Sequence, residues 1–123
     1  MSVRVDELID KFGFEVIVYG NSAIEISSTE LNRPGLQFAG YYSHFSNERI
    51  QLIGMTEWSY MKSLPKDICD KRFKEYLKKF TPCIIVTRGL EIPEALVKYA
   101  KVYNRTILRT EQETTRVISR LKR

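Results

Sequence analysis

The chain has 123 residues, a formal net charge of +5, 43% hydrophobic residues and 28% charged residues. This length suits one domain over residues 1–123, and the composition excludes a disordered chain. No apolar run reaches the roughly 18–20 residues that cross a bilayer, and the acidic start excludes a signal peptide, so we expect a cytoplasmic protein.

The first segments predict a helix followed by two strands. “VDELIDKF” (5–12) has apolar residues at helical spacing, with Ser2 as its N-cap and Gly13 placed to end it. “FEVIVYG” (14–20) and “AIEIS” (23–27) have the β-branched and alternating patterns of strands. The short turn between them allows the two strands to pair as a hairpin.

A proline-glycine corner comes next. Pro34 and Gly35 predict a turn, because proline fixes one backbone angle and glycine relaxes the next. “RIQLIG” (49–54) predicts a third, buried strand. Between the turn and this strand we expect a short helix with four residues on one face: Leu36, Phe38, Ala39 and Tyr42.

Two helices are predicted in the middle of the chain. Thr56 can cap the first, which ends near Pro65. The second, “KDICDKRFKEYLKKF” (66–80), is amphipathic. Its expected apolar side consists of Ile68, Phe73, Tyr76, Leu77 and Phe80.

The last part of the chain alternates strands and helices. “PCIIVT” (82–87) is a short continuous apolar run, typical of a strand in the middle of a parallel sheet. Pro93 suits the first turn of a helix that Asn104 ends, and “TILRT” forms a short strand. Thr110 and Glu113 match a capping box that opens a final helix.

This alternation indicates an α/β fold. We expect a single three-layer-like domain with a mostly parallel sheet flanked by helices.

The sequence contains no recognisable catalytic centre. It has no phosphate-binding loop, no dinucleotide fingerprint and no nucleophile elbow. Cys69 and Cys83 are too few for a disulfide framework, lack the spacing of a zinc site, and are expected to be unreactive thiols. We therefore expect no catalytic residue, no metal and no cofactor in this chain.

Turns after two predicted strands could form a small anion-binding rim. Thr87, Arg88 and Gly89 follow one strand and offer a hydroxyl, a guanidinium and free backbone N–H groups. Arg109 and Thr110 follow another strand at a helix N-terminus, where anions are favoured. An Arg-Gly turn is common, however, and Thr110 is already explained as a cap.

Arg33 and His44, in the proline-glycine segment, are the other two candidate ligand residues. A lone histidine is more often a surface or hydrogen-bonded residue than a catalyst. The aromatic residues are expected in the core or an interface rather than stacked on bases, because they fall on predicted helices away from the basic clusters. They are Tyr41, Tyr42, Phe45 and Trp58.

Three segments resemble a known family in their order and spacing. They are “NRPGLQFAGYYSHFSNERIQLIGMTEWSYM”, “TPCIIVTRGLEIPEAL” and “ILRTEQETTRVISRL”. Together they resemble the N-terminal domain of bacterial HPr kinase/phosphorylase, and the similarity runs from Val3 to Leu121. It implies an α/β fold similar to the first domain of cell-wall amino-acid ligases, and a role in assembly or regulation.

The resemblance also implies a parent enzyme that uses ATP to phosphorylate a serine of HPr and reverses this by phosphorolysis, which controls carbon catabolite repression. Its chemistry lies in a C-terminal domain with a P-loop and a Mg²⁺ site. None of those motifs occurs here, so ATP and magnesium would belong to that domain and this chain would be inactive alone. The implied partners are its own C-terminal kinase domain, HPr through the full-length enzyme, and further copies of the chain, with no membrane.

Three functional hypotheses follow. The first is a regulatory or assembly domain of an HPr kinase/phosphorylase. The second is a free-standing sensor that binds a small anionic metabolite at Arg33, Arg88 and Arg109. The third and least favoured is nucleic-acid binding through the basic C-terminal helix, because lysines and arginines spaced along a helix are most often a solvated face.

Overall fold

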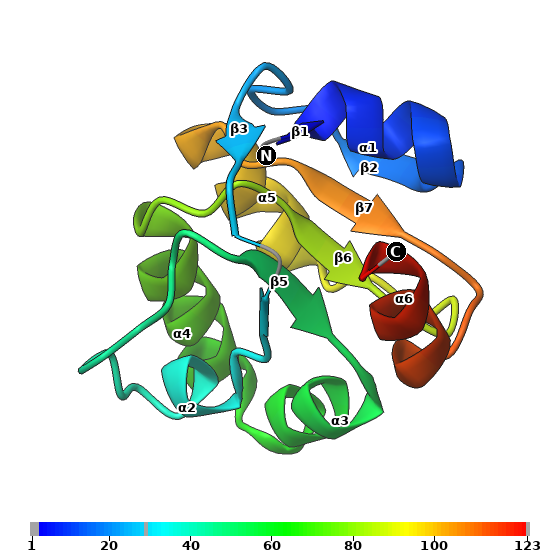
Figure 1. The fold of residues 1–123 in the computed structure, drawn as a ribbon. Coiled ribbons are helices and arrows are strands. Elements are labelled where there is room, and N and C mark those ends of the chain that lie inside the picture. Colours follow the sequence, from blue (N-terminus) through cyan, green and yellow to red (C-terminus); the bar gives the residue numbers. More distant parts are fainter. Residues whose placement is uncertain (1–2, 29, 123) are drawn as a thin grey trace.

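The computed structural model describes residues 3–28 and 30–122 and contains a five-stranded main sheet and a small second sheet. The main sheet consists of β2 (Glu15–Val18), β4 (Leu31–Asn32), β5 (Ile50–Ile53), β6 (Ile84–Val86) and β7 (Ile107–Arg109). The small sheet pairs β1 (Val3–Arg4) with β3 (Glu25–Ile26). The strand order in the main sheet is β2-β7-β6-β5-β4 (Figure 1), with β2 antiparallel to β7 and the other pairs parallel.

Helices flank both faces of the main sheet. They are α1 (Val5–Phe12), α2 (Gly35–Phe38), α3 (Met55–Ser63), α4 (Lys66–Lys78), α5 (Glu94–Tyr103) and α6 (Thr114–Leu121). Residues of α2, α3, α4 and α5 form one buried cluster with the sheet, and residues of α1, α6 and the small sheet form the other. Strand β6 serves both, since Ile84 and Val86 face the first cluster and Ile85 faces the second. The predicted α/β class and mostly parallel sheet are therefore confirmed.

The first helix forms as predicted and ends at Gly13, which adopts a left-handed φ of 67°. Ser2, the predicted N-cap, lies outside the described residues, and Arg4 occupies the N-cap position. The first helical N–H groups are satisfied instead by main-chain carbonyls, since Val5 N donates to Ile24 O at 3.0 Å.

The predicted hairpin is wrong. Strand β2 pairs with β7, with an irregularity between Val16 and Val18, while β3 pairs with β1. The pairing with β7 satisfies hydrogen-bonding groups that would otherwise remain on an open edge of the main sheet, and it brings Val18 into the same buried cluster as Ile107. Strand β4 was also missed, because its two residues, just before the predicted Pro34–Gly35 turn, are too few to show a strand pattern.

The expected apolar face of α2 is only partly correct. Phe38 is buried, but Leu36 is 63% exposed, Ala39 is exposed and Tyr42 lies beyond the end of the helix. Gln37 is buried in their place because its amide joins a hydrogen-bond network described below.

Helix α4 buries three of its five expected apolar residues, and Ile68 and Phe80 are exposed. The buried stripe starts at Cys69, four residues before Phe73, so Ile68 lies beside the stripe. Phe80 follows the end of the helix, where the Arg105 guanidinium lies 5.8 Å from its ring centre.

Three predicted helix starts shift by a few residues. Gly54 rather than Thr56 is the N-cap of α3, and Pro93 precedes α5 as its N-cap. Glu113 is itself the N-cap of α6, so the predicted capping box is wrong. Thr110 instead accepts a hydrogen bond from Gln112 N at 3.2 Å. These differences arise because several residues near each helix start could serve as caps.

Both cysteines are free thiols, Cys69 half-buried and Cys83 buried. Burial raises the pKa of the Cys69 thiol, and full burial raises the pKa of Cys83 to about 12. None of the helices in the described ranges combines the length and apolar content that spanning a bilayer requires.

Candidate functional site

The carboxyl edge of the parallel strands is the expected location of a ligand site in an α/β sheet. Arg33 follows β4, the Thr87-Arg88-Gly89 segment follows β6, and Arg109 ends β7. Five of the six residues singled out from the sequence therefore lie at this edge.

Arg33 is held by a bidentate ion pair with Glu57 of α3. Its Nε and Nη2 atoms each donate to a Glu57 carboxylate oxygen at 3.0 Å. The carboxylate is only 6% exposed and also accepts the Gly54 N–H at 2.7 Å. Since a buried carboxylate needs a paired cation, Arg33 has a structural role in joining the end of β4 to the start of α3.

Thr87 is fully buried, so its hydroxyl is not presented to solvent. The Oγ1 atom donates to Ile53 O at 3.2 Å and lies 2.9 Å from Thr114 Oγ1. This hydroxyl pair connects β6 to the first residue of α6. Adjacent to it, a Cβ added to Gly54 would lie 2.6 Å from Thr114 Oγ1, so the end of β5 and α6 are in close contact.

Arg88 and Gly89 form a left-handed turn, each with a φ of 60°. Their N–H groups were expected to be free, and this is wrong: Arg88 N donates to Gln112 O at 2.9 Å and Gly89 N to Thr110 O at 2.8 Å. The segment entering α6 returns alongside the turn and uses these donors. A Cβ at Gly89 would lie 2.8 Å from Glu111 Oε2, so a carboxylate lies where an anion would have to approach.

Arg109 is paired across the sheet with Glu15 of β2. Its Nε and Nη2 atoms donate to the two carboxylate oxygens at 2.9 and 3.0 Å, and Nη1 donates to Leu90 O at 3.4 Å. The hydrogen bond from Arg109 lowers the pKa of Glu15. Strands β6 and β5 separate Arg109 from the end of β4, a distance of roughly 14 Å between strand axes, so Arg109 and Arg33 do not converge.

His44 lies away from the other candidates. It is exposed, has a positive φ of 63°, and belongs to the loop that leads from α2 to the start of β5. In that loop Asn47 Nδ2 donates to Phe80 O at 3.1 Å, which places it near the amino end of β6. His44 is therefore at the opposite edge of the sheet from Arg88.

The four aromatic residues named above are not equivalent. Tyr41 is 51% exposed, whereas Tyr42, Phe45 and Trp58 are half-buried. Phe45 and Trp58 pack against the first buried cluster, and Trp58 Nε1 donates to Glu91 O at 2.9 Å. Burial raises the pKa of Tyr42 to about 12.

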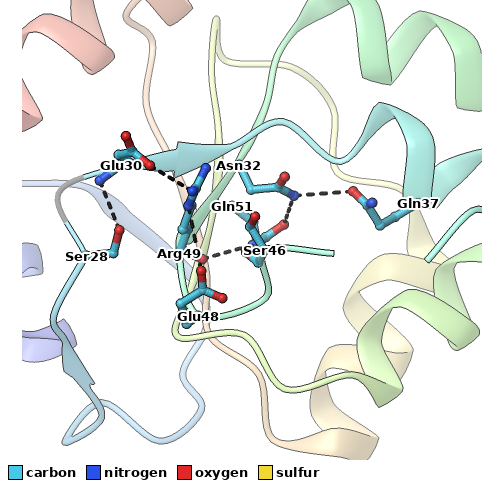
Figure 2. A network of polar contacts seen from close by, with 8 residues as sticks. All are labelled: Ser28, Glu30, Asn32, Gln37, Ser46, Glu48, Arg49 and Gln51. Carbon is cyan, nitrogen blue, oxygen red and sulfur yellow. Dashed lines mark hydrogen bonds and ion pairs between the residues drawn. The ribbon is translucent and has the colours of Figure 1, made fainter. Parts of the chain in front are cut away.

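The principal polar feature that the sequence did not reveal is a buried amide network (Figure 2). Gln51, in the centre of β5, has no exposed surface. Its Oε1 accepts Asn32 Nδ2 at 2.7 Å and the Tyr76 hydroxyl at 2.9 Å. Its Nε2 donates to Arg49 O at 2.9 Å and Ser46 O at 3.3 Å, so all four hydrogen-bonding positions of the amide are used.

This network connects β4, β5, α2 and α4. Asn32 Nδ2 also lies 3.3 Å from Gln37 Oε1, and Gln37 Nε2 donates to Tyr41 O at 3.3 Å. A polar residue inside the apolar run “RIQLIG” was the one sequence signal that could have indicated it. The proline-glycine segment therefore supplies structural contacts.

The polar groups at the carboxyl edge are mostly bonded to one another, and this limits the chemistry available there. In the described part of the chain, no three His, Cys, Asp or Glu side chains are grouped so that they could hold a metal. An open hollow of about 660 Å³ over α6 is lined by polar residues, including Arg116 and Arg120. Arg120 already donates to Gln112 Oε1 at 2.8 Å.

Comparison with known proteins gives one family. The chain matches the family described as “HPr Serine kinase N terminus” over residues 3–123. It is 42% identical over 121 residues to the HPr kinase/phosphorylase of Clostridium acetobutylicum, covering 98% of this chain and 40% of that protein. It is 44% identical over 121 residues to the Clostridium novyi protein of the same name, covering 98% and 39%. The chain thus spans about two fifths of the length of the curated relatives it matches.

The solved structures with a similar fold include one of the CBS and DRTGG domains of the regulatory region of Clostridium perfringens pyrophosphatase, complexed with the activator diadenosine tetraphosphate. The TM-score is 0.64 at 18% sequence identity, with 97% of this chain and 45% of that chain covered. At this identity the similarity shows a shared fold alone.

Proposed function

Because the chain belongs to the HPr serine kinase N-terminal family, we propose that it is a non-catalytic regulatory and assembly domain of an HPr serine kinase/phosphorylase. The observation that carries this proposal is the match along residues 3–123 to relatives whose own chains are about two and a half times as long. The side chains at the carboxyl edge support it, since Arg33, Thr87 and Arg109 are bonded within the fold.

The proposal places the chemistry outside these 123 residues. ATP and magnesium bind the catalytic part of the enzyme, which phosphorylates a serine of HPr in the cytoplasm and contributes to carbon catabolite repression. The partners of this chain are that catalytic part and further copies of the enzyme. We also propose that the fold of this chain is similar to that of the first domain of cell-wall amino-acid ligases.

A phosphorylation assay with this chain tests the first part. We expect no change in the mass of HPr after incubation with the chain, ATP and Mg²⁺. Transfer of a phosphoryl group to HPr under these conditions would refute a non-catalytic role.

A chimera tests the second part. Two variants of the Clostridium acetobutylicum enzyme are compared: a chimera, in which this chain replaces the matched N-terminal region, and a truncated enzyme, in which that region is deleted. We expect both variants to phosphorylate HPr. Only the chimera should keep the oligomer size of the parent enzyme and its balance of kinase and phosphorolysis activity. If the truncated enzyme matches the parent in both properties, the regulatory and assembly role is wrong.

The metabolite-sensor hypothesis has weaker support. Arg33 and Arg109 are each paired with a carboxylate and lie on different parts of the edge. Arg88 is exposed, so Arg88→Ala leaves the packing intact. A thermal shift with sugar phosphates or nucleotides that Arg88→Ala abolishes would favour this second function.

A further inference from the structure

A groove of about 330 Å³ lies between the edge strand β4 and helix α6. It is lined by Glu30, Leu31, Arg33, Arg49, Ile118 and Lys122. Thr87, Arg88 and Thr114 are not among its lining residues.

Strand β4 leaves one side of the main sheet open along this groove. Within the described residues it pairs only with β5, through Leu31 opposite Ile50 and Asn32 opposite Gln51. In a strand, successive residues direct their N–H and C=O groups to alternate sides, so part of the β4 backbone faces the open edge. Such an edge can pair with an extended segment of another chain.

The side chains around the groove define the chemistry of that segment. Leu31 and Ile118 are half-buried and pack against the second buried cluster, so they provide an apolar floor. The lining carries three cations, Arg33, Arg49 and Lys122, and one carboxylate, Glu30, while the Glu57 carboxylate beside the groove also pairs with Arg33. This composition complements a segment in which an apolar side chain is flanked by acidic ones.

Two of the cations have donors outside their present contacts. The pair with Glu57 uses Nε and Nη2 of Arg33, and Nη1 takes no part in it. Arg49 Nε is buried without a hydrogen-bond partner; the Glu48 carboxylate at 3.7 Å is beyond hydrogen-bond range. Arg49 Nη2 lies 2.7 Å from Glu30 Oε2 (Figure 2), so a carboxylate of the chain already occupies part of the cationic rim.

We propose that this groove binds an extended acidic peptide segment of a partner protein, which adds to the open edge of β4. An apolar side chain of the segment rests on Leu31 and Ile118, and its carboxylates contact Arg33, Arg49 and Lys122. A single-stranded nucleic acid fits less well, because the groove lining contains no aromatic ring on which a base could stack.

A fluorescently labelled short peptide that alternates valine with glutamate tests the proposal by anisotropy at low salt. We expect it to bind, and a peptide that alternates valine with lysine not to bind. Lys122→Glu should weaken binding at least about fivefold, equivalent to about 1 kcal/mol. Glu30→Gln should strengthen binding, because it removes the carboxylate that competes for Arg49.

Lys101→Glu, an identical charge change on the exposed side of α5, is the matched control and should leave the affinity close to that of the unaltered chain. On binding, amide exchange in β4 should slow at the residue whose N–H faces the open edge. The proposal is overturned if the lysine peptide binds equally well, if Lys101→Glu weakens binding as much as Lys122→Glu, or if the acidic peptide does not bind. Displacement of the acidic peptide by low concentrations of oligothymidine would favour a nucleic-acid ligand instead.

Discussion

Gln51 is a polar residue in a strand whose other members are apolar, and its amide is saturated by four hydrogen bonds. A buried amide is tolerated only when its donors and acceptors are paired. Because the partners come from Asn32, Tyr76 and two main-chain carbonyls, Gln51 fixes the relative positions of β4, β5 and α4.

Gln51→Leu should therefore destabilise the protein. The leucine fills a similar volume but removes the partner of the buried Tyr76 hydroxyl and of Arg49 O. Asn32 Nδ2 keeps only Gln37 Oε1, at 3.3 Å, and Ser46 O keeps only Arg49 N, at 3.3 Å. We expect the free energy of unfolding, measured in urea, to fall by about 2–4 kcal/mol. Gln112→Leu is the matched control and should change it by no more than about 1 kcal/mol, because Gln112 is only half-buried and accepts one side-chain bond. Equal effects of the two substitutions would contradict a special role for the buried network.

At the scale of elements, the fold depends on close contacts where strands end. Gly54, between β5 and α3, leaves no space for a side chain: a Cβ would lie 2.6 Å from Thr114 Oγ1 and 2.8 Å from Arg33 Nη2. Gly35, at the start of α2, has no atom within 4 Å of an added Cβ. The two glycines allow the same substitution to be compared in a crowded and an open position.

Gly54→Ala should lower the free energy of unfolding by about 1–3 kcal/mol, because α6 or Arg33 must move away from β5. Gly35→Ala should leave it unchanged or raise it by up to about 1 kcal/mol, because alanine is the better helix former. Urea denaturation of both variants provides the measurement. A stable Gly54→Ala protein would show that the contact between β5 and α6 can relax without loss.

The elements that sequence patterns predicted best are those whose pattern is local. The continuous apolar run of β6 and the helical spacing in α1 led to correct assignments, since each depends on neighbours along the chain. The wrong hairpin shows the limit of such patterns. Strand β2 pairs with β7, and Glu15 meets Arg109 at a separation of 94 residues, which no local pattern encodes.

The same limit applies to the candidate site. The rule that ligands gather at the carboxyl ends of strands placed Arg88 and Arg109 along one edge, while Arg33 lies at the same edge only because of the unpredicted strand β4. The rule could not reveal that Glu57 pairs with Arg33 and Glu15 with Arg109, or that the turn into α6 uses the N–H groups of Arg88 and Gly89. Those contacts depend on tertiary packing.

For the whole molecule, the buried Cys83 links the stability of the fold to alkaline pH. Burial raises its pKa from 9.0 to about 12. A group whose pKa is raised by folding contributes stability that is complete below its unfolded pKa and is lost as the pH rises through the folded value. The window for this thiol is therefore about pH 9 to pH 12.

As the pH rises across this window, we expect ionisation of the Cys83 thiol to reduce the free energy of unfolding by up to about 4 kcal/mol. Cys83→Ala should have a flatter dependence on pH, measured as the difference between its urea denaturation curves and those of the unaltered chain at each pH. Cys69→Ala is the control, and its free energy of unfolding should depend on pH nearly as steeply as that of the unaltered chain, because Cys69 is only half-buried. Tyr42, whose pKa is also about 12, is present in both variants. The difference in pH dependence between Cys83→Ala and the unaltered chain therefore excludes its contribution. Identical slopes for the two cysteine variants would exclude this contribution.

The pairing of β2 with β7 also has a consequence during synthesis on the ribosome. Residues 15–18 emerge early, but their partner at residues 107–109 is made last among the strands. At translation rates of roughly 5–20 residues per second, β2 must wait several seconds before it can join the main sheet. Because β2 can pair only after β7 has been made, we infer that this edge of the sheet forms late in folding. Its formation then limits the rate at which nascent chains become resistant to proteases.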